Sequence, residues 1–186
     1  MTDLNGQIAE LLLKCKESFL EHRLMVATAE SLTGGLISAY LTSLPGSSEF
    51  FDRAFITYNN RAKHEMLEVS ALTLENMSEL SLGCVAEMAA GTIRRSHAHL
   101  SVAVSGVAGP SGGNDANPVG TVYVGFGVRG EGLYVNRCHF AGDRDGVRLN
   151  TVCEALKGLY TLSEGRIPAG YRVAHSFIPE APNLHI

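Results

Sequence analysis

The strongest constraint on the fold is a repeated alternation between short apolar segments and longer segments that have apolar residues at helical spacing. Residues 24–28, 54–58 and 100–105 are short, apolar and include β-branched side chains, which is typical of buried strands. Two later segments, residues 121–128 and 133–140, are separated by a short glycine-containing turn and predict a hairpin. Alternating strands and helices followed by a hairpin predict an α/β fold, a three-layer α/β/α sandwich with a mixed sheet.

The expected helices lie between these strands. Apolar side chains recur every three or four residues from residue 3 to 22, Pro45-Gly46 ends the second helix, and Asp143 is placed to cap the last one. The expected helices are residues 3–22, 36–44, 62–67, 81–96 and 146–162.

Length and composition predict one folded domain followed by a tail. The chain has 186 residues, of which 45% are hydrophobic and 18% are charged, and these values are typical of a globular protein. Residues 168–186 contain three prolines and show little periodicity. We therefore expect a domain at residues 1–165 and an extended tail at residues 166–186.

The charge balance argues against several classes of partner. A net charge of −4 does not suit a nucleic-acid-binding protein, although one phosphate in a local pocket remains compatible with it. The N-terminus lacks a basic start followed by an apolar run, and no stretch of about 18 uncharged apolar residues occurs. The sequence therefore predicts a cytoplasmic protein with neither a nucleic-acid nor a membrane partner.

The spacing of cysteine and histidine does not predict a metal site. None of the four cysteines forms a Cys-x-x-Cys pair, which favours free thiols in a reducing cytosol. His97 and His99 would face the same side only if their segment is extended. We therefore expect no metal at this histidine pair.

The first candidate site is the turn that contains Ser31 and Gly34-Gly35. A glycine pair lets the backbone approach a ligand closely, and the helix that follows offers unpaired N–H groups and a positive dipole end. Ser31 is then either an anion ligand or a nucleophile. The alternative is that Ser31 or Thr33 only caps the helix, which is common for these residue types. The turn matches neither a Walker loop nor a Gly-x-Ser-x-Gly elbow.

The second candidate site follows the strand at residues 54–58. A serine hydroxyl needs a base at neutral pH, and a lysine serves as one where a dry pocket or a nearby cation lowers its pKa. Tyr58 and Lys63 are five residues apart, so both side chains reach one pocket if the strand ends at Tyr58. The alternative is that Lys63 is a solvated helix lysine.

Two more loops carry candidate residues. The segment that begins at Ser105-Gly106 is glycine-rich and suits a backbone that packs against a flat ligand, or it is a plain connector. Arg144 and Arg148 are one helical turn apart and are spaced to hold a phosphate between them. The alternative is that they form surface ion pairs with Asp143 and Asp145.

Taken together, these four segments and two others resemble one family, the CinA C-terminal domain family, over roughly Ile8 to Leu162. The six motifs that carry the resemblance, in family order, are Ala29-Glu30-Ser31-Leu32-Thr33-Gly34-Gly35, Pro45-Gly46-Ser47-Ser48, Thr57-Tyr58-Asn59-Asn60 with Ala62-Lys63, Ser105-Gly106-Val107-Ala108-Gly109-Pro110-Ser111-Gly112-Gly113, Pro118-Val119-Gly120-Thr121-Val122 and Phe140-Ala141-Gly142-Asp143-Arg144. The resemblance implies a nicotinamide-nucleotide amidohydrolase that converts nicotinamide mononucleotide and water to nicotinate mononucleotide and ammonia.

The resemblance also implies catalytic roles. The nucleophilic serine of the family matches Ser31, its lysine matches Lys63 and its tyrosine matches Tyr58. Ser31 would form an acyl-enzyme, while Lys63 and Tyr58 would take the hydroxyl proton and return it to the departing ammonia. No metal or organic cofactor is implied.

The substrate contacts are carried over in the same way. Backbone N–H groups from Thr33 to Gly35 would hold the oxyanion, Ser105 and Gly106 would line the pyridine pocket, and Arg144 would contact the phosphate. The expected substrate-binding residues are Glu30, Thr33, Gly34, Gly35, Ser105, Gly106, Gly109 and Arg144.

The sequence departs from the family pattern at two positions. Leu32 stands where the family usually has a cysteine, and Leu82 stands where it has a glutamate. Two alternatives therefore accompany the main prediction: a catalytically weak paralogue that binds a nucleotide or phosphate ligand, and a hydrolase of another small amide. The resemblance further implies the stand-alone form of the family, and we expect a homo-oligomer.

Overall fold

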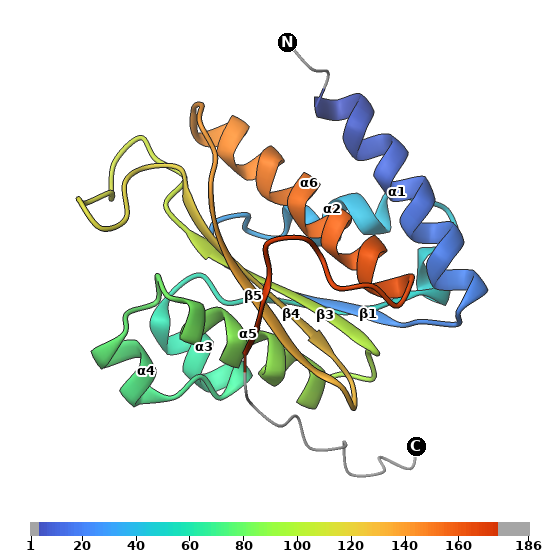
Figure 1. Cartoon of the computed structure of the whole chain (residues 1–186), viewed down its shortest axis with the longest axis horizontal. Coiled ribbons are helices and arrows are strands. Elements are labelled where there is room, and N and C mark those ends of the chain that lie inside the picture. Colours follow the sequence, from blue (N-terminus) through green and yellow to red (C-terminus); the bar gives the residue numbers. More distant parts are fainter. Residues whose placement is uncertain (1–3, 175–186) are drawn as a thin grey trace.

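The computed structural model describes residues 4–174, and a six-stranded mixed sheet lies at its centre between two layers of helices (Figure 1). The strands are β1 (Val26–Glu30), β2 (Phe51–Ile56), β3 (Leu100–Gly106), β4 (Thr121–Val128), β5 (Gly132–His139) and β6 (Arg172–Ala174). The helices are α1 (Leu4–Glu21), α2 (Leu36–Thr42), α3 (Asn60–Leu67), α4 (Ala71–Asn76), α5 (Leu82–Arg94) and α6 (Arg144–Ser163), with a short 3-10 helix at Ser47–Glu49. The predicted three-layer α/β/α sandwich is confirmed.

The sheet has the strand order β2-β1-β3-β4-β5-β6, in which β1 pairs in parallel with both β2 and β3. The hairpin β4–β5 and the edge strand β6 are antiparallel to their neighbours. Because the first three strands are parallel, their carboxyl ends meet at one edge of the sheet. The loops that follow them therefore gather there, as ligand sites do in open α/β sheets.

Alternate side chains of the central strands enter two separate cores. Val102 and Val104 of β3 pack with α1, α2 and α6, whereas Ala103 between them packs with α5 on the opposite face. This division follows from the two-residue period of a strand. Figure 1 shows the same two helical layers, with α1, α2 and α6 on one side of the sheet and α3, α4 and α5 on the other. No helix within residues 4–174 is long and apolar enough to cross a bilayer.

The first helix is held by the apolar stripe that its sequence predicts. Ile8, Leu12, Cys15 and Phe19 lie one turn apart along α1 and are all buried. The ring of Phe19 packs against that of Phe50 with 5.8 Å between centroids. Burial of this stripe anchors α1 beside α6.

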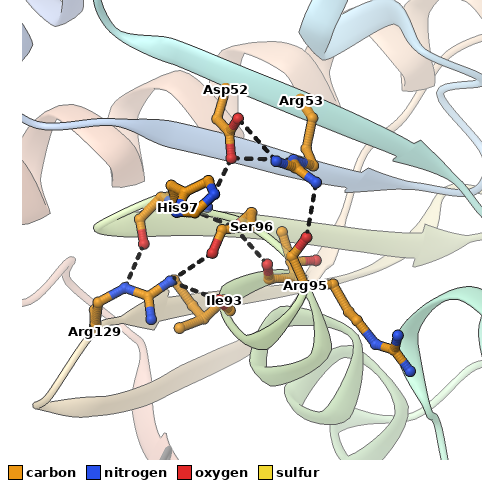
Figure 2. A network of polar contacts seen from close by, with 9 residues as sticks. Asp52, Arg53, Ile93, Arg95, Ser96, His97 and Arg129 are labelled. Carbon is orange, nitrogen blue, oxygen red and sulfur yellow. Dashed lines mark hydrogen bonds and ion pairs between the residues drawn. The ribbon is translucent and has the colours of Figure 1, made fainter. Parts of the chain in front are cut away.

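A polar network holds the end of the sheet that lies away from the carboxyl ends of β1, β2 and β3 (Figure 2). The carboxylate of Asp52, on β2, accepts the backbone N–H of His97 at 2.7 Å. Arg129 donates to the carbonyl oxygens of Ile93, Ser96 and Ala98 at 2.6 to 3.0 Å. These carbonyls lie at the end of α5 and in the loop after it, where a helix leaves its last acceptors unpaired. The network therefore holds the C-terminal end of α5, which lies at the other end of the sheet from the glycine loops.

Three elements were not predicted, and the first is the 3-10 helix at Ser47–Glu49. Helix α4 has only Thr73 buried, and Leu72 is 68% exposed, so its sequence lacks the periodic apolar signal. Strand β6 lies within the segment expected to be an extended tail and pairs with β5. Tyr171, just before β6, packs on Phe126 with 5.1 Å between ring centroids. The last part of the predicted tail, residues 175–186, lies outside the described residues.

Close packing of α6 on the sheet yields a stability prediction. A Cβ added at Gly158 would overlap the ring of Phe126 on β4. On helix propensity alone, Gly158→Ala would stabilise α6 by about 1 kcal/mol. We expect the reverse, a loss of about 1–3 kcal/mol in the free energy of unfolding measured in urea, because the overlap forces the core apart.

The matched control is the same substitution with Phe126 shortened. In a Phe126→Leu background, Gly158→Ala should cost less than in the wild-type chain, because the smaller side chain leaves room for the new methyl group. A stabilised Gly158→Ala protein would contradict this packing.

Candidate active site

The glycine and asparagine loops that follow the parallel strands form one cleft of about 240 Å³. Ser31 is the first residue after β1, and its backbone N–H donates to the carbonyl of Val104 on β3 at 3.1 Å. On the other side, Thr57 after β2 donates its N–H to the carbonyl of Glu30 at 2.9 Å. The residues that line the cleft are Ser31, Leu32, Tyr58, Glu79, Leu80, Ser105, Gly106, Val107, Ala108, Gly109, Ser111, Gly112 and Arg144.

The Ser31 turn depends on two glycines in left-handed conformations. Gly34 has φ 61° and Gly35 has φ 97°, values that a side chain with a Cβ rarely adopts. The turn directs the chain from β1 into α2 within five residues. The hydroxyl of Ser31, at the beginning of this turn, contacts the β2–α3 connection and α3.

Glu30 accepts hydrogen bonds from the backbone N–H groups at the start of α2. Its buried carboxylate accepts the backbone N–H groups of Gly35, Ile37 and Ser38 at 3.1, 3.0 and 2.8 Å. A carboxylate also complements the positive end of the helix. The alternative in which Ser31 or Thr33 caps the helix is wrong, because Gly35 is the N-cap residue and the capping oxygens belong to Glu30.

Ser31 and Lys63 are brought together at the base of the cleft. Lys63 Nζ lies 3.2 Å from Ser31 Oγ and donates to the carbonyl of Thr57 at 2.9 Å. The Ser31 hydroxyl also donates to the main-chain carbonyl of Tyr58 at 3.3 Å. These contacts connect a hydroxyl in the turn after β1 to an amine on α3, 32 residues away in the sequence.

Lys63 is placed by the first turn of α3. The side chain of Asn59 caps this helix by accepting the N–H of Ala62 at 2.8 Å. Lys63 is fully buried, so the alternative of a solvated helix lysine is wrong. Burial lowers the pKa of Lys63, while Cys84 and Glu79 oppose that shift. The structure therefore favours the neutral amine more than an exposed lysine would.

Tyr58 and Arg144 meet at the mouth of the cleft. Tyr58 is 60% exposed, and its hydroxyl accepts from the Arg144 guanidinium at 3.3 Å. The same guanidinium donates to the carbonyl of Gly109 at 2.9 Å. Arg144 thus links the β2–α3 connection to the glycine loop, and it is the Tyr58 carbonyl, on the main chain, that contacts Ser31.

Arg148 does not share this position with Arg144. Its guanidinium donates to the carbonyl of Thr33 at 2.9 Å and lies 3.5 Å from Asp145. Asp143 caps α6 by accepting the N–H of Gly146 at 2.8 Å, as the sequence predicts. Arg148 therefore supports the Ser31 turn from outside the cleft.

Two of the three N–H groups expected to hold an oxyanion are occupied. Gly34 donates its N–H to the carbonyl of Ser31 at 3.0 Å, and Gly35 donates to Glu30. Within the described residues, the N–H groups of Leu32 and Thr33 have no hydrogen-bond acceptor. These two donors remain available at the start of the turn.

The contributions of three residues to the site were not predicted from the sequence. Thr57 supplies the carbonyl that holds Lys63, and a carbonyl carries no sequence signal. Glu79 and Leu80 enter the cleft from the connection between α4 and α5. Because α4 itself was not predicted, nothing in the sequence indicated that this connection reaches the cleft.

The capping role of Glu30 can be tested by Glu30→Gln. A glutamine offers one acceptor oxygen and turns an NH₂ group toward N–H donors, so at least one contact is lost. We expect the free energy of unfolding in urea to fall by about 1–3 kcal/mol.

The control is Glu17→Gln on the exposed face of α1, which should change stability by less than about 0.5 kcal/mol. Equal stability of the Glu30→Gln protein and this control would show that the Glu30 carboxylate does not hold α2.

The fold and the cleft define the class to which the chain belongs: an α/β protein with a buried serine–lysine pair at the carboxyl edge of a mixed sheet. Residues 8–163 match the family described as the CinA C-terminal domain. The chain is a member of this family.

Relatives cover most of the chain. "Nicotinamide-nucleotide amidohydrolase PncC" of Enterobacter agglomerans is 46% identical over 132 residues, which is 71% of this chain and 80% of that protein. The protein of the same name from Pseudomonas putida is 41% identical and covers 83% of this chain and 96% of its own length. The crystal structure of competence/damage inducible protein CihA from Agrobacterium tumefaciens superposes with a TM-score of 0.83 at 41% identity, covering 84% of this chain and 96% of that one.

Proposed function

We propose that the protein hydrolyses the carboxamide of nicotinamide mononucleotide to give nicotinate mononucleotide and ammonia. The observation that carries the proposal is the 3.2 Å contact between Oγ of Ser31, which lines the cleft, and Nζ of the buried Lys63. The names of relatives at 41 to 46% identity support the substrate class. A serine beside a neutral amine is one arrangement that supports amide hydrolysis by acyl transfer.

In the proposed first step, Ser31 Oγ attacks the carboxamide carbon while neutral Lys63 accepts the hydroxyl proton. The tetrahedral intermediate then collapses: the C–N bond breaks, Lys63 returns the proton to the leaving nitrogen, and ammonia departs. A serine ester of the nicotinate group remains. Water attacks this ester with Lys63 again as base, which releases the carboxylate and restores the Ser31 hydroxyl.

The oxyanion is assigned to the unoccupied N–H groups of Leu32 and Thr33. They precede α2, and its dipole favours negative charge at this end. Glu30 is then a positioning residue: it accepts the N–H groups of Gly35 and Ile37 and so holds the start of the helix, while the N–H groups of Leu32 and Thr33 stay free.

The remaining cleft residues are assigned to the nucleotide. Ser105 and Gly106, at the end of β3, are proposed to lie beside the pyridine ring, and Gly109 continues the same wall. Arg144 is proposed to release its contact with Tyr58 and bind the phosphate. In this arrangement the Ser31 hydroxyl turns its proton from the Tyr58 carbonyl to neutral Lys63 before the attack, and the Tyr58 ring covers the bound substrate.

Ser31→Ala tests the nucleophile. We expect ammonia release from nicotinamide mononucleotide to fall by about 10³-fold or more, because the acyl-enzyme cannot form. Ser43→Ala, at the exposed end of α2, is the matched control and should retain wild-type activity.

Other outcomes of this assay would contradict the mechanism or favour one of the two alternative functions. Release that survives Ser31→Ala would contradict the mechanism. Calorimetric binding of the nucleotide without release by the wild-type chain would favour a binding paralogue, and release from other amides alone would favour a different substrate.

The role of Lys63 predicts a pH dependence. Burial lowers the pKa of Lys63, and only the deprotonated amine accepts the Ser31 proton. The value of kcat/KM should therefore rise as pH increases through that lowered pKa. In Lys63→Met this limb should disappear along with most of the activity, whereas Lys16→Met on α1 should keep the wild-type profile. A profile that is flat from acidic to alkaline pH would contradict Lys63 as the base.

A further inference from the structure

Glu79 lines the cleft, and the proposed mechanism does not use its carboxylate. It lines the same space as Ser31, Tyr58 and Arg144. Its Oε2 accepts from the side-chain amide of Asn60, the first residue of α3, at 3.3 Å. Glu79 is half-buried, and within residues 4–174 its carboxylate forms no ion pair. The cleft therefore contains an acidic residue that is not paired directly with a cation.

The charge of Glu79 affects the part of the cleft that contains Ser31 and Lys63. Glu79 is near enough to Lys63 to raise the pKa of that amine, against the larger effect of burial. The other titratable group beside Lys63 is the Cys84 thiol, and burial raises its pKa to about 12, so it is uncharged at neutral pH. Arg144 is the cation among the lining residues, and Gly109 and Tyr58 hold it.

Hydrolysis of a carboxamide changes the charge at this end of the bound molecule. The substrate presents a neutral amide beside Ser31, and the product presents a carboxylate in the same place. Two like charges in a half-buried site repel each other more strongly than they would in water. A fixed anion there opposes the product and leaves the substrate almost unaffected.

We propose that Glu79 determines specificity at the acyl end of the cleft, favouring a neutral carboxamide over an anionic carboxylate and so promoting release of the acid product. The inference rests on the proposed function, since it takes the amide and acid forms of one nucleotide as substrate and product. Asn60 is the positioning residue that keeps the carboxylate directed into the cleft.

The experiment compares binding of the two nucleotides to chains that cannot turn over. Calorimetry gives Kd for nicotinamide mononucleotide and for nicotinate mononucleotide with Ser31→Ala and with Ser31→Ala combined with Glu79→Gln. We expect the ratio of the acid Kd to the amide Kd to fall about tenfold when Glu79 is neutralised, the effect of roughly one pKa unit of charge repulsion.

Two further variants distinguish charge from structure. Glu79→Asp keeps the carboxylate and should retain most of the parental ratio. Glu75→Gln, on exposed α4 and outside the cleft, removes the same charge four residues away and should leave the ratio unchanged. Thermal unfolding of each variant verifies that the fold is intact.

The outcomes separate this inference from the proposed function. An unchanged ratio in the Glu79→Gln chain, or equal weakening of both ligands, would overturn the role of Glu79 while the amidohydrolase proposal stands. Failure of both nucleotides to bind the Ser31→Ala chain would overturn the proposed substrate and this inference with it.

Discussion

The structure depends on one buried amine. Lys63 is withdrawn from water at the first turn of α3 and is held between the Thr57 carbonyl at 2.9 Å and Ser31 Oγ at 3.2 Å. A charged ammonium is costly in such a place, so burial shifts the equilibrium toward the neutral base. The desolvation that would make an ordinary lysine unfavourable here makes this one suited to take a proton from a serine.

The sheet provides the precision that this contact needs. Hydrogen bonds that continue the sheet beyond β1 hold Ser31. Its backbone N–H donates to a carbonyl of β3, and the carbonyl of the preceding residue accepts the N–H of Thr57, which follows β2. Glu30 fixes the turn from within by holding three N–H groups of α2, and Arg148 fixes it from outside through the carbonyl of Thr33. Charged groups on both sides of the turn thus hold Ser31 in place.

Much of the fold followed from local patterns, because buried strands and the stripe of α1 have strong periodic signals. The capping role of Asp143 was also predicted, since an acidic residue before a helix has one common use. The roles of the site residues were harder to predict from the sequence. Local physics favoured Ser31 as a cap and Lys63 as a surface lysine, and only the order of the motifs pointed to catalysis. Glu79 was not predicted to reach the site, because it lies in the connection after the unpredicted helix α4. Thr57 was part of a predicted motif, but its contact with Lys63 is made by a main-chain carbonyl, which has no sequence signal.

The central claim is that Lys63 is the base for Ser31, and direct titration of Lys63 tests it best. NMR of a chain with labelled lysines, assigned by Lys63→Met, would give the pKa of this amine for comparison with the acid limb of kcat/KM. The account predicts that Lys63 titrates well below the ordinary lysine value of about 10.4 and at the same pH as the kinetic limb. A Lys63 that titrates at the ordinary value, with a limb elsewhere, would contradict it.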